Sequence, residues 1–315
     1  MSDRPAVLPL LAVGTTLVFW ASAFVAIRHL GDHIGPGALS LGRLVVGSLA
    51  LGVVLLARRA WRTPRRADWL PLVAIGLLWF GVYNVALNEG ERRVDAGTAA
   101  MLIQVAPVLI AVLAVWFLHE RSTLALWVGL VVAFAGVAVI SFASRPGSPG
   151  GDRDVVGVLL CLLAAAVYSV SVILQKPLMT RLTALQVTWV ACTVGAVACL
   201  PFAPALVDDL GSASAADIGW VVYLGVFPTA IAFTTYAYAL THMSASSLGV
   251  TTYLVPPITV LMAWLLLDET PPALAYVGGV LCLVGVALAR RRPRPPHVKR
   301  SHGDLTTRRH PAERP

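Results

Sequence analysis

Two apolar segments of the chain, 95–140 and 244–289, repeat one another at a constant offset of 149 residues. The alignment needs no gap and pairs polar and helix-breaking residues: Pro107 with Pro256, Glu120 with Glu269, Gly129 with Gly278, and Gly136 with Gly285. Such pairs are much harder to obtain by chance than matched Leu or Val residues. The chain is therefore predicted to be an internal duplication. Prolines that interrupt corresponding apolar segments of two halves point to the binding site of a membrane transporter.

Composition places the chain in a membrane. It is 57% hydrophobic and 13% charged, with a mean hydropathy of +0.78. Apolar runs of about 18 residues or more recur along its length, and such runs predict transmembrane helices. The four cysteines lie inside these runs, which favours packed thiols over a disulfide or metal framework. The net charge of +8 does not indicate nucleic-acid binding, because the cations lie between and after the apolar runs.

The runs predict an all-α integral membrane protein of ten transmembrane helices, arranged as two five-helix repeats. The first repeat covers 7–143 and the second 155–290. The basic, Pro-rich segment 291–315 has no apolar face to bury and is predicted to be a disordered cytoplasmic tail. The predicted spans are 7–28, 37–57, 69–88, 95–118, 123–143, 155–176, 184–206, 218–240, 244–267 and 272–290.

Basic residues predict the orientation, because Lys and Arg gather on the cytoplasmic side of membrane proteins. With the N-terminus inside, 18 of the 24 Lys and Arg residues fall on cytoplasmic segments and five on outer ones. Both termini are therefore expected in the cytoplasm, with the protein in the cell (inner) membrane. Since each repeat has an odd number of spans, the second repeat enters the membrane from the opposite side, which makes the repeats inverted.

The first spans of the two halves also align, at an offset of 148, with Trp20 on Tyr168 and Arg28 on Lys176. The stretch from Trp20 to Arg28 resembles the opening helix of EamA-type transporters in the drug/metabolite transporter superfamily. Further matches to that pattern, twice along the chain, are Arg43, Ala86-Leu87, 96–100, Pro107 and Glu120, then Ala239-Leu240, Pro256 and Glu269.

The resemblance implies ten helices, with the first four of each half around a central cavity and the fifth and tenth at the periphery. It also implies export of amino acids or other small metabolites from the cytoplasm. One departure from the pattern is expected: residues 88–93 follow Ala86-Leu87 as an insert, longer than Thr241-His242 after Ala239-Leu240.

Polar side chains in hydrocarbon are costly and usually face a cavity or a partner. Gln104 and Tyr253 are repeat mates beside the symmetric prolines, and Trp20 and Tyr168 are mates near the bilayer centre. Helix–helix hydrogen bonding or core filling is the alternative role for each. The candidate substrate-binding residues are Trp20, Arg43, Asn84, Gln104, Tyr168, Phe233, Tyr236 and Tyr253, and the candidate helix-kinking residues are Pro107, Pro256 and Pro257.

Arg43 has three possible roles: it can reach the membrane surface, tie helices together, or bind a substrate carboxylate. Acidic residues and histidines occur only in loops, tails or span ends. We therefore expect facilitated diffusion, or coupling through a span-end acid such as Asp95 or Glu120. Hydrolase, zinc-protease and P-loop motifs are absent, so the sequence predicts no enzyme, no cofactor and no metal site.

The prediction is a secondary transporter, an exporter of small metabolites such as amino acids, that works by alternating access around a midplane cavity. Three alternatives stay open: a nucleotide-sugar or sugar-phosphate carrier, a non-transporting membrane scaffold, and an intramembrane enzyme. The expected partners are a small-molecule substrate and membrane lipid, without nucleic acid. Whether the chain forms a homodimer is left open.

Overall fold

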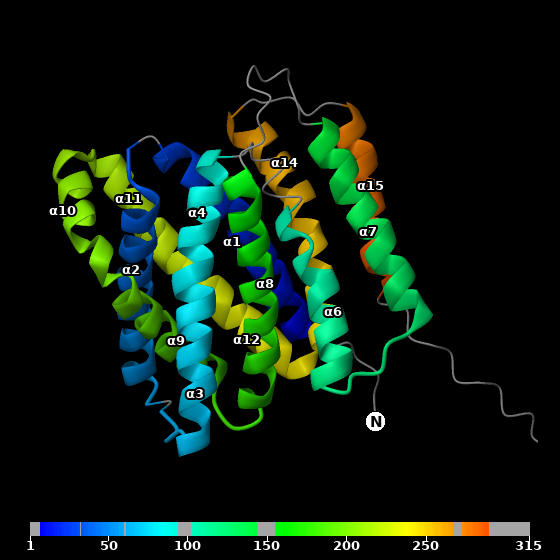
Figure 1. Cartoon of the computed structure of the whole chain (residues 1–315), viewed down its shortest axis with the longest axis horizontal. Helices are drawn as coiled ribbons and strands as arrows, with labels where there is room; N and C mark the ends of the chain where they lie inside the picture. Colours follow the sequence, from blue (N-terminus) through cyan, green and yellow to red (C-terminus); the bar gives the residue numbers. More distant parts are fainter. Residues whose placement is uncertain are drawn as a thin grey trace, which may run out of the picture.

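The computed structural model describes residues 7–31, 33–59, 61–93, 102–143, 155–267 and 273–289. These residues form helices that run back and forth between two ends of one bundle (Figure 1). The end at which α1 begins, near Val7, is called the inner end below, and the opposite end is called the outer end. This naming follows the predicted orientation.

The first repeat contains α1 (Val7–Leu30), α2 (Pro36–Ala57), α3 (Arg66–Ile75), η1 (Gly76–Val82), α4 (Tyr83–Arg93), α6 (Ala106–Phe117) and α7 (Leu124–Ala143). The second contains α8 (Val155–Leu178), α9 (Ala184–Ala198), η2 (Leu200–Phe202), α10 (Ala203–Ser212), α11 (Ala215–Leu224), η3 (Gly225–Ile231), α12 (Ala232–His242), α13 (Ala245–Thr251), η4 (Thr252–Leu254), α14 (Val255–Leu267) and α15 (Ala273–Ala289).

Length and composition identify five described helices as candidate membrane spans, or six if the bent pair Ala184–Ala198 and Leu200–Ser212 counts as one. Shorter apolar helices lie beside them, including Ala106–Phe117. The class of all-helical membrane protein is therefore confirmed, whereas ten complete spans remain a prediction. The predicted tail, the loop between the repeats, Asp95 and Glu269 lie outside the described residues.

The seventh predicted span is not one straight helix. It bends by 52° where α9 ends and η2 begins. Pro201 and Pro204 follow the bend, each near the start of a new helical segment. A proline lacks the backbone N–H and clashes with the preceding turn, so it interrupts a helix interior but is tolerated in a first turn.

The third and eighth spans follow the same backbone path. Each begins as an α-helix, passes through a seven-residue π-helix and continues as an 11-residue α-helix. The two π-helices, η1 and η3, lie 149 residues apart, which is the sequence offset of the repeat. The insert expected at 88–93 is wrong, because α4 runs through these residues and matches α12 in length.

A glycine opens each π-helix and allows a close helix crossing. A Cβ on Gly76 would lie 2.5 Å from Val194 Cβ and 2.7 Å from the Ala191 carbonyl oxygen on α9. A Cβ on Gly225 would lie 2.5 Å from Val46 Cβ and 2.9 Å from the Arg43 carbonyl oxygen on α2. Both crossings therefore need glycine, since real Cβ contacts are not this short.

Two groups of packed helices each combine both repeats, and α2 of one group packs on α9 of the other. In the α1/α2 group, these two helices pack against α11, η3, α12 and α14. In the α8/α9 group, these two helices pack against α3, η1, α4 and α6. Helices α7 and α15 pack on each other at one edge of the bundle (Figure 1). The resemblance implied this peripheral position for the fifth and tenth helices.

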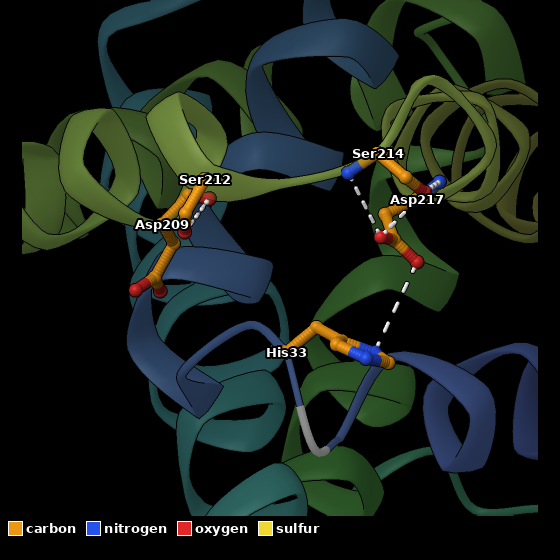
Figure 2. Close-up of polar contacts among 5 residues, drawn as sticks. All are labelled: His33, Asp209, Ser212, Ser214 and Asp217. Carbon is orange, nitrogen blue, oxygen red and sulfur yellow. Dashed lines mark hydrogen bonds and ion pairs between the residues drawn. The ribbon is translucent and has the colours of Figure 1, made fainter.

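A buried carboxylate caps the first helix of the third span, α3, and of the eighth span, α11. Asp217 accepts the Ser214 backbone N–H at 3.0 Å and lies 4.0 Å from His33 of the α1–α2 connection (Figure 2). At the inner end, Asp68 accepts the Arg65 backbone N–H at 2.9 Å and pairs with Arg181. Each ion pair joins the two repeats within one helix group.

Candidate functional site

An aromatic cluster lies where the two helix groups meet. Trp20 is its hub, with ring centroids 5.1 Å from Tyr236, 5.5 Å from Phe233 and 6.1 Å from Tyr168. Trp79 of η1 lies 5.0 Å from both Tyr168 and Phe233. The sequence predicted that Trp20, Tyr168, Phe233 and Tyr236 share one site, and the structure brings all four together.

The cluster holds polar atoms as well as ring faces. The Tyr168 hydroxyl donates to the Tyr236 hydroxyl at 3.2 Å. The Nε1–H of Trp20 is buried and has no hydrogen-bond partner among the described residues. An indole N–H that is buried normally has an acceptor. The cluster can therefore offer one donor to a small polar group that sits among the rings.

The rings themselves fill this part of the bundle. Trp79, Tyr168, Phe233 and Tyr236 are each no more than 5% exposed. Offset and edge-to-face packing at these distances stabilises aromatic pairs beyond the burial of their area. A substrate that binds here must therefore displace or separate rings, so the described arrangement is a closed one.

Gln104 lies beside the prolines as the sequence predicted, and its contact has a clear cause. Residues 104–105 form a turn before α6, which carries Pro107 in its first turn. The Gln104 side-chain amide donates to the Thr252 carbonyl at 3.1 Å. That carbonyl lacks its usual helical donor, because the residue four positions later is Pro256. The Thr252 carbonyl accepts the Val255 backbone N–H instead, and Gln104 of the other repeat supplies a second hydrogen bond to it.

Tyr253 is not part of the aromatic cluster. It is fully buried in a second apolar cluster with Ala111 and Cys282, and its ring lies 6.5 Å from Phe134 of α7. Its hydroxyl has no described partner there. The neighbouring residue, Thr252, donates its hydroxyl to the Gly249 carbonyl at 2.8 Å, and its own carbonyl accepts the Gln104 amide. The repeat symmetry that paired Gln104 with Tyr253 therefore does not extend to their surroundings.

Arg43 is buried, and it ties two helices together. Its Nε–H donates to the Thr229 hydroxyl at 3.0 Å, and that hydroxyl donates to the Leu224 carbonyl at 2.8 Å. The Leu224 carbonyl lacks its usual helical donor, because the residue four positions later is Pro228 in η3. Of the three roles open to Arg43, helix tying is the one for which a contact is described.

Asn84 serves the other π-helix in a similar way. Its side-chain amide donates to the carbonyls of Trp79 at 3.3 Å and Phe80 at 2.8 Å. This contact secures the backbone that presents the Trp79 ring to the cluster. Asn84 therefore supports the η1 backbone, and its described hydrogen bonds are to that backbone and not to the rings of the cluster.

Three cluster residues were missed from the sequence: Trp79, Phe80 and Tyr83. Trp79 carries the signal that singled out Trp20, namely an indole well inside a predicted span. It was overlooked because its repeat mate is Pro228, so the search for matched pairs passed over it.

The EamA-like transporter family matches the chain twice, at residues 8–142 and 155–291. The chain belongs to this family. The resemblance drawn from the sequence is confirmed, and so is the presence of two EamA repeats. An EamA protein is a multi-pass membrane transporter of small molecules and not an enzyme, which removes the intramembrane-enzyme alternative.

Individual relatives agree with the family. The "Probable terminal-alkyne amino-acid exporter" of Streptantibioticus cattleyicolor is 42% identical over 89% of this chain and 93% of its own length. The "Uncharacterized transporter YdfC" of Bacillus subtilis is 31% identical over 85% and 86%. A crystal structure aligns with a TM-score of 0.73, covering 90% of this chain and 96% of that one. At 20% identity, this last likeness shows the fold alone.

Proposed function

We propose that this EamA transporter exports amino acids or closely related small metabolites across the cell membrane. The observation that carries the proposal is the buried Trp20 Nε1–H, which lacks a partner among the described residues and lies in an aromatic cluster built from both repeats. A carboxylate or carbonyl would complete this donor, and apolar walls with few polar groups are typical of small-molecule sites. The exporter name of the 42% identical relative supports the same class.

The proposed transport cycle is alternating access. The α1/α2 group and the α8/α9 group would rock against each other, with the substrate held at the aromatic cluster between them. Ring faces of Trp20, Tyr168 and Tyr236 suit both an apolar side chain and an ammonium group, because cations are attracted to aromatic faces. Ten spans, two cytoplasmic termini and action as a monomer or homodimer remain parts of this proposal.

A nucleotide-sugar or sugar-phosphate carrier is less well supported. Phosphate binding calls for several converging Lys or Arg side chains. Among the residues whose side chains the structure describes, Arg43 is the only buried Lys or Arg, and its described hydrogen bond is to Thr229.

The direct test is efflux from proteoliposomes loaded with single radiolabelled amino acids, apolar and aromatic ones first. We expect efflux of at least one of them, competed by unlabelled substrate and reduced in Trp20→Ala at equal protein content. If no amino acid leaves while a sugar nucleotide does, the proposed class is wrong. Efflux should persist after the pH gradient is collapsed, because the buried acids that the structure describes, Asp68 and Asp217, cap the ends of spans.

A further inference from the structure

The turn between α12 and α13 at the inner end is held from both sides by charged side chains. Lys176 at the end of α8 donates to the carbonyls of Leu240 and Met243. Glu120, which follows α6, accepts the backbone N–H groups of Ala245 at 2.7 Å and Ser246 at 3.2 Å. It also accepts the Ser246 hydroxyl at 2.7 Å.

Each charge suits the helix end that it meets. The last carbonyls of a helix carry partial negative charge and the first N–H groups carry partial positive charge. Lys176 lies at the end of α12, and Glu120 lies at the start of α13. The turn therefore has a cation on its carbonyl side and an anion on its N–H side.

The position of Glu120 is set by the backbone before it. His119 has a φ of 52°, in the left-handed region that residues other than glycine rarely occupy. The Glu120 backbone N–H then donates to the Ala114 carbonyl at 3.1 Å. A residue keeps such a conformation only where its surroundings hold it, and here it directs the carboxylate at α13.

These contacts differ from the ion pairs at the span ends in one respect. Asp68–Arg181 and Asp217–His33 each lie within one helix group. Glu120 and Lys176 belong to the α8/α9 group, whereas the turn they hold continues into α12 and α14 of the α1/α2 group. If the groups rock against each other, the within-group pairs can persist, but the contacts of Glu120 and Lys176 must break for the inner end to open.

We propose that Glu120 and Lys176 form an inner latch that keeps the transporter closed toward the cytoplasm until both release the α12–α13 turn. The inference rests on the alternating-access part of the proposed function. It assigns the conformational equilibrium, rather than substrate contact, to these two residues. They are positioning residues, so their loss shifts which end of the site is accessible and leaves the aromatic cluster intact.

Two repeat mates provide reporters for the two ends. Ser171 lies three residues after Tyr168 on α8, and Ala23 lies three residues after Trp20 on α1, so each shares a helix face with a cluster residue. Both are buried. A thiol at Ser171→Cys would report reagent access from the inner end, and a thiol at Ala23→Cys would report access from the outer end. The four native cysteines are buried and set the background.

The experiment measures the rate of N-ethylmaleimide labelling of each reporter in the full-length protein in membrane vesicles, without substrate. In Glu120→Gln and in Lys176→Met, labelling of the Ser171→Cys thiol should accelerate about tenfold, because each variant removes charge-assisted hydrogen bonds. Labelling of the Ala23→Cys thiol should slow. Ser246→Ala, which removes one of the three donors to Glu120, should act in the same direction but less.

Arg121→Gln is the matched control, because Arg121 is exposed and adjacent to Glu120. It should change neither rate. Unchanged rates in Glu120→Gln and Lys176→Met would overturn the latch, and so would equal acceleration of both reporters, which indicates general loosening. Since no substrate is used, a failure of amino-acid efflux alone would count against the proposed substrate class and not against the latch.

Discussion

The two repeats share one backbone and bring different side chains to its centre. Gly76 and Gly225 open π-helices of equal length and cross α9 and α2 at the same close distance. Four residues after these glycines, the first repeat has Phe80 in the aromatic cluster, and the second has Thr229, which accepts a hydrogen bond from Arg43. The duplication therefore explains the path of the chain, whereas the aromatic cluster is asymmetric.

The largest expected effect comes from substitutions that disturb the helix crossings shared by the two repeats. Gly76→Ala and Gly225→Ala should each destabilise the protein by about 1–3 kcal/mol, because the added Cβ meets backbone carbonyls and β-branched Val side chains that cannot move far. Thermal unfolding in detergent should show similar losses in both variants. Gly14→Ala is the control, since nothing lies within 4 Å of its Cβ position. A loss in only one of the two variants would refute the structural equivalence of the crossings.

An effect of similar size concerns the capping carboxylates. Asp68→Ala should lower stability by about 1.5–3 kcal/mol, because it removes hydrogen bonds to a charged group that is 2% exposed. Asp217→Ala should cost less, since its basic partner is an imidazole at 4.0 Å instead of a guanidinium in direct contact. Melting temperatures of the two variants, measured side by side, check this order. Equal losses would mean that helix capping alone sets the cost.

Sequence alone predicted much of the fold, because repeated prolines, glycines and apolar runs determine where helices lie and break. It did not predict the π-helices, since no residue pattern distinguishes them from ordinary helical turns in an apolar run. It also missed the bend after Ala198, although Pro201 and Pro204 are visible signals for it.

The aromatic cluster was predicted in part, for a related reason. Trp20 and Tyr168 were singled out because both copies of the repeat carry an aromatic residue there. Tyr253 was expected beside Gln104, but the turn at η4 rotates its ring toward Phe134 of α7 and away from the cluster. Such a rotation of about 100° depends on the local break rather than on the order of residues.

The third prediction uses that rotation. Trp20→Phe keeps an aromatic ring and removes only the unpaired donor, so substrate half-saturation should rise about 2- to 10-fold. Tyr253→Phe should leave half-saturation unchanged, because its hydroxyl is buried away from the cluster without a described partner. Efflux kinetics at matched expression measure both values. A weaker affinity in Tyr253→Phe alone would show that the Tyr253 hydroxyl, and not the Trp20 Nε1–H, contacts the substrate.

The smallest expected effect sharpens the comparison of the two ends. His33→Arg would place a permanent cation beside Asp217, as Arg181 does beside Asp68 at the inner end. The gain should be only about 0.2–1 kcal/mol, because the His33 side chain is 56% exposed and exposed ion pairs are screened by water and salt. The melting temperature should rise slightly at low ionic strength, and the rise should vanish in high salt. The same substitution with Asp217→Ala present should give no gain, since the new cation would have lost its carboxylate. A gain that survives both high salt and Asp217→Ala would show that the arginine stabilises the outer end through packing rather than charge.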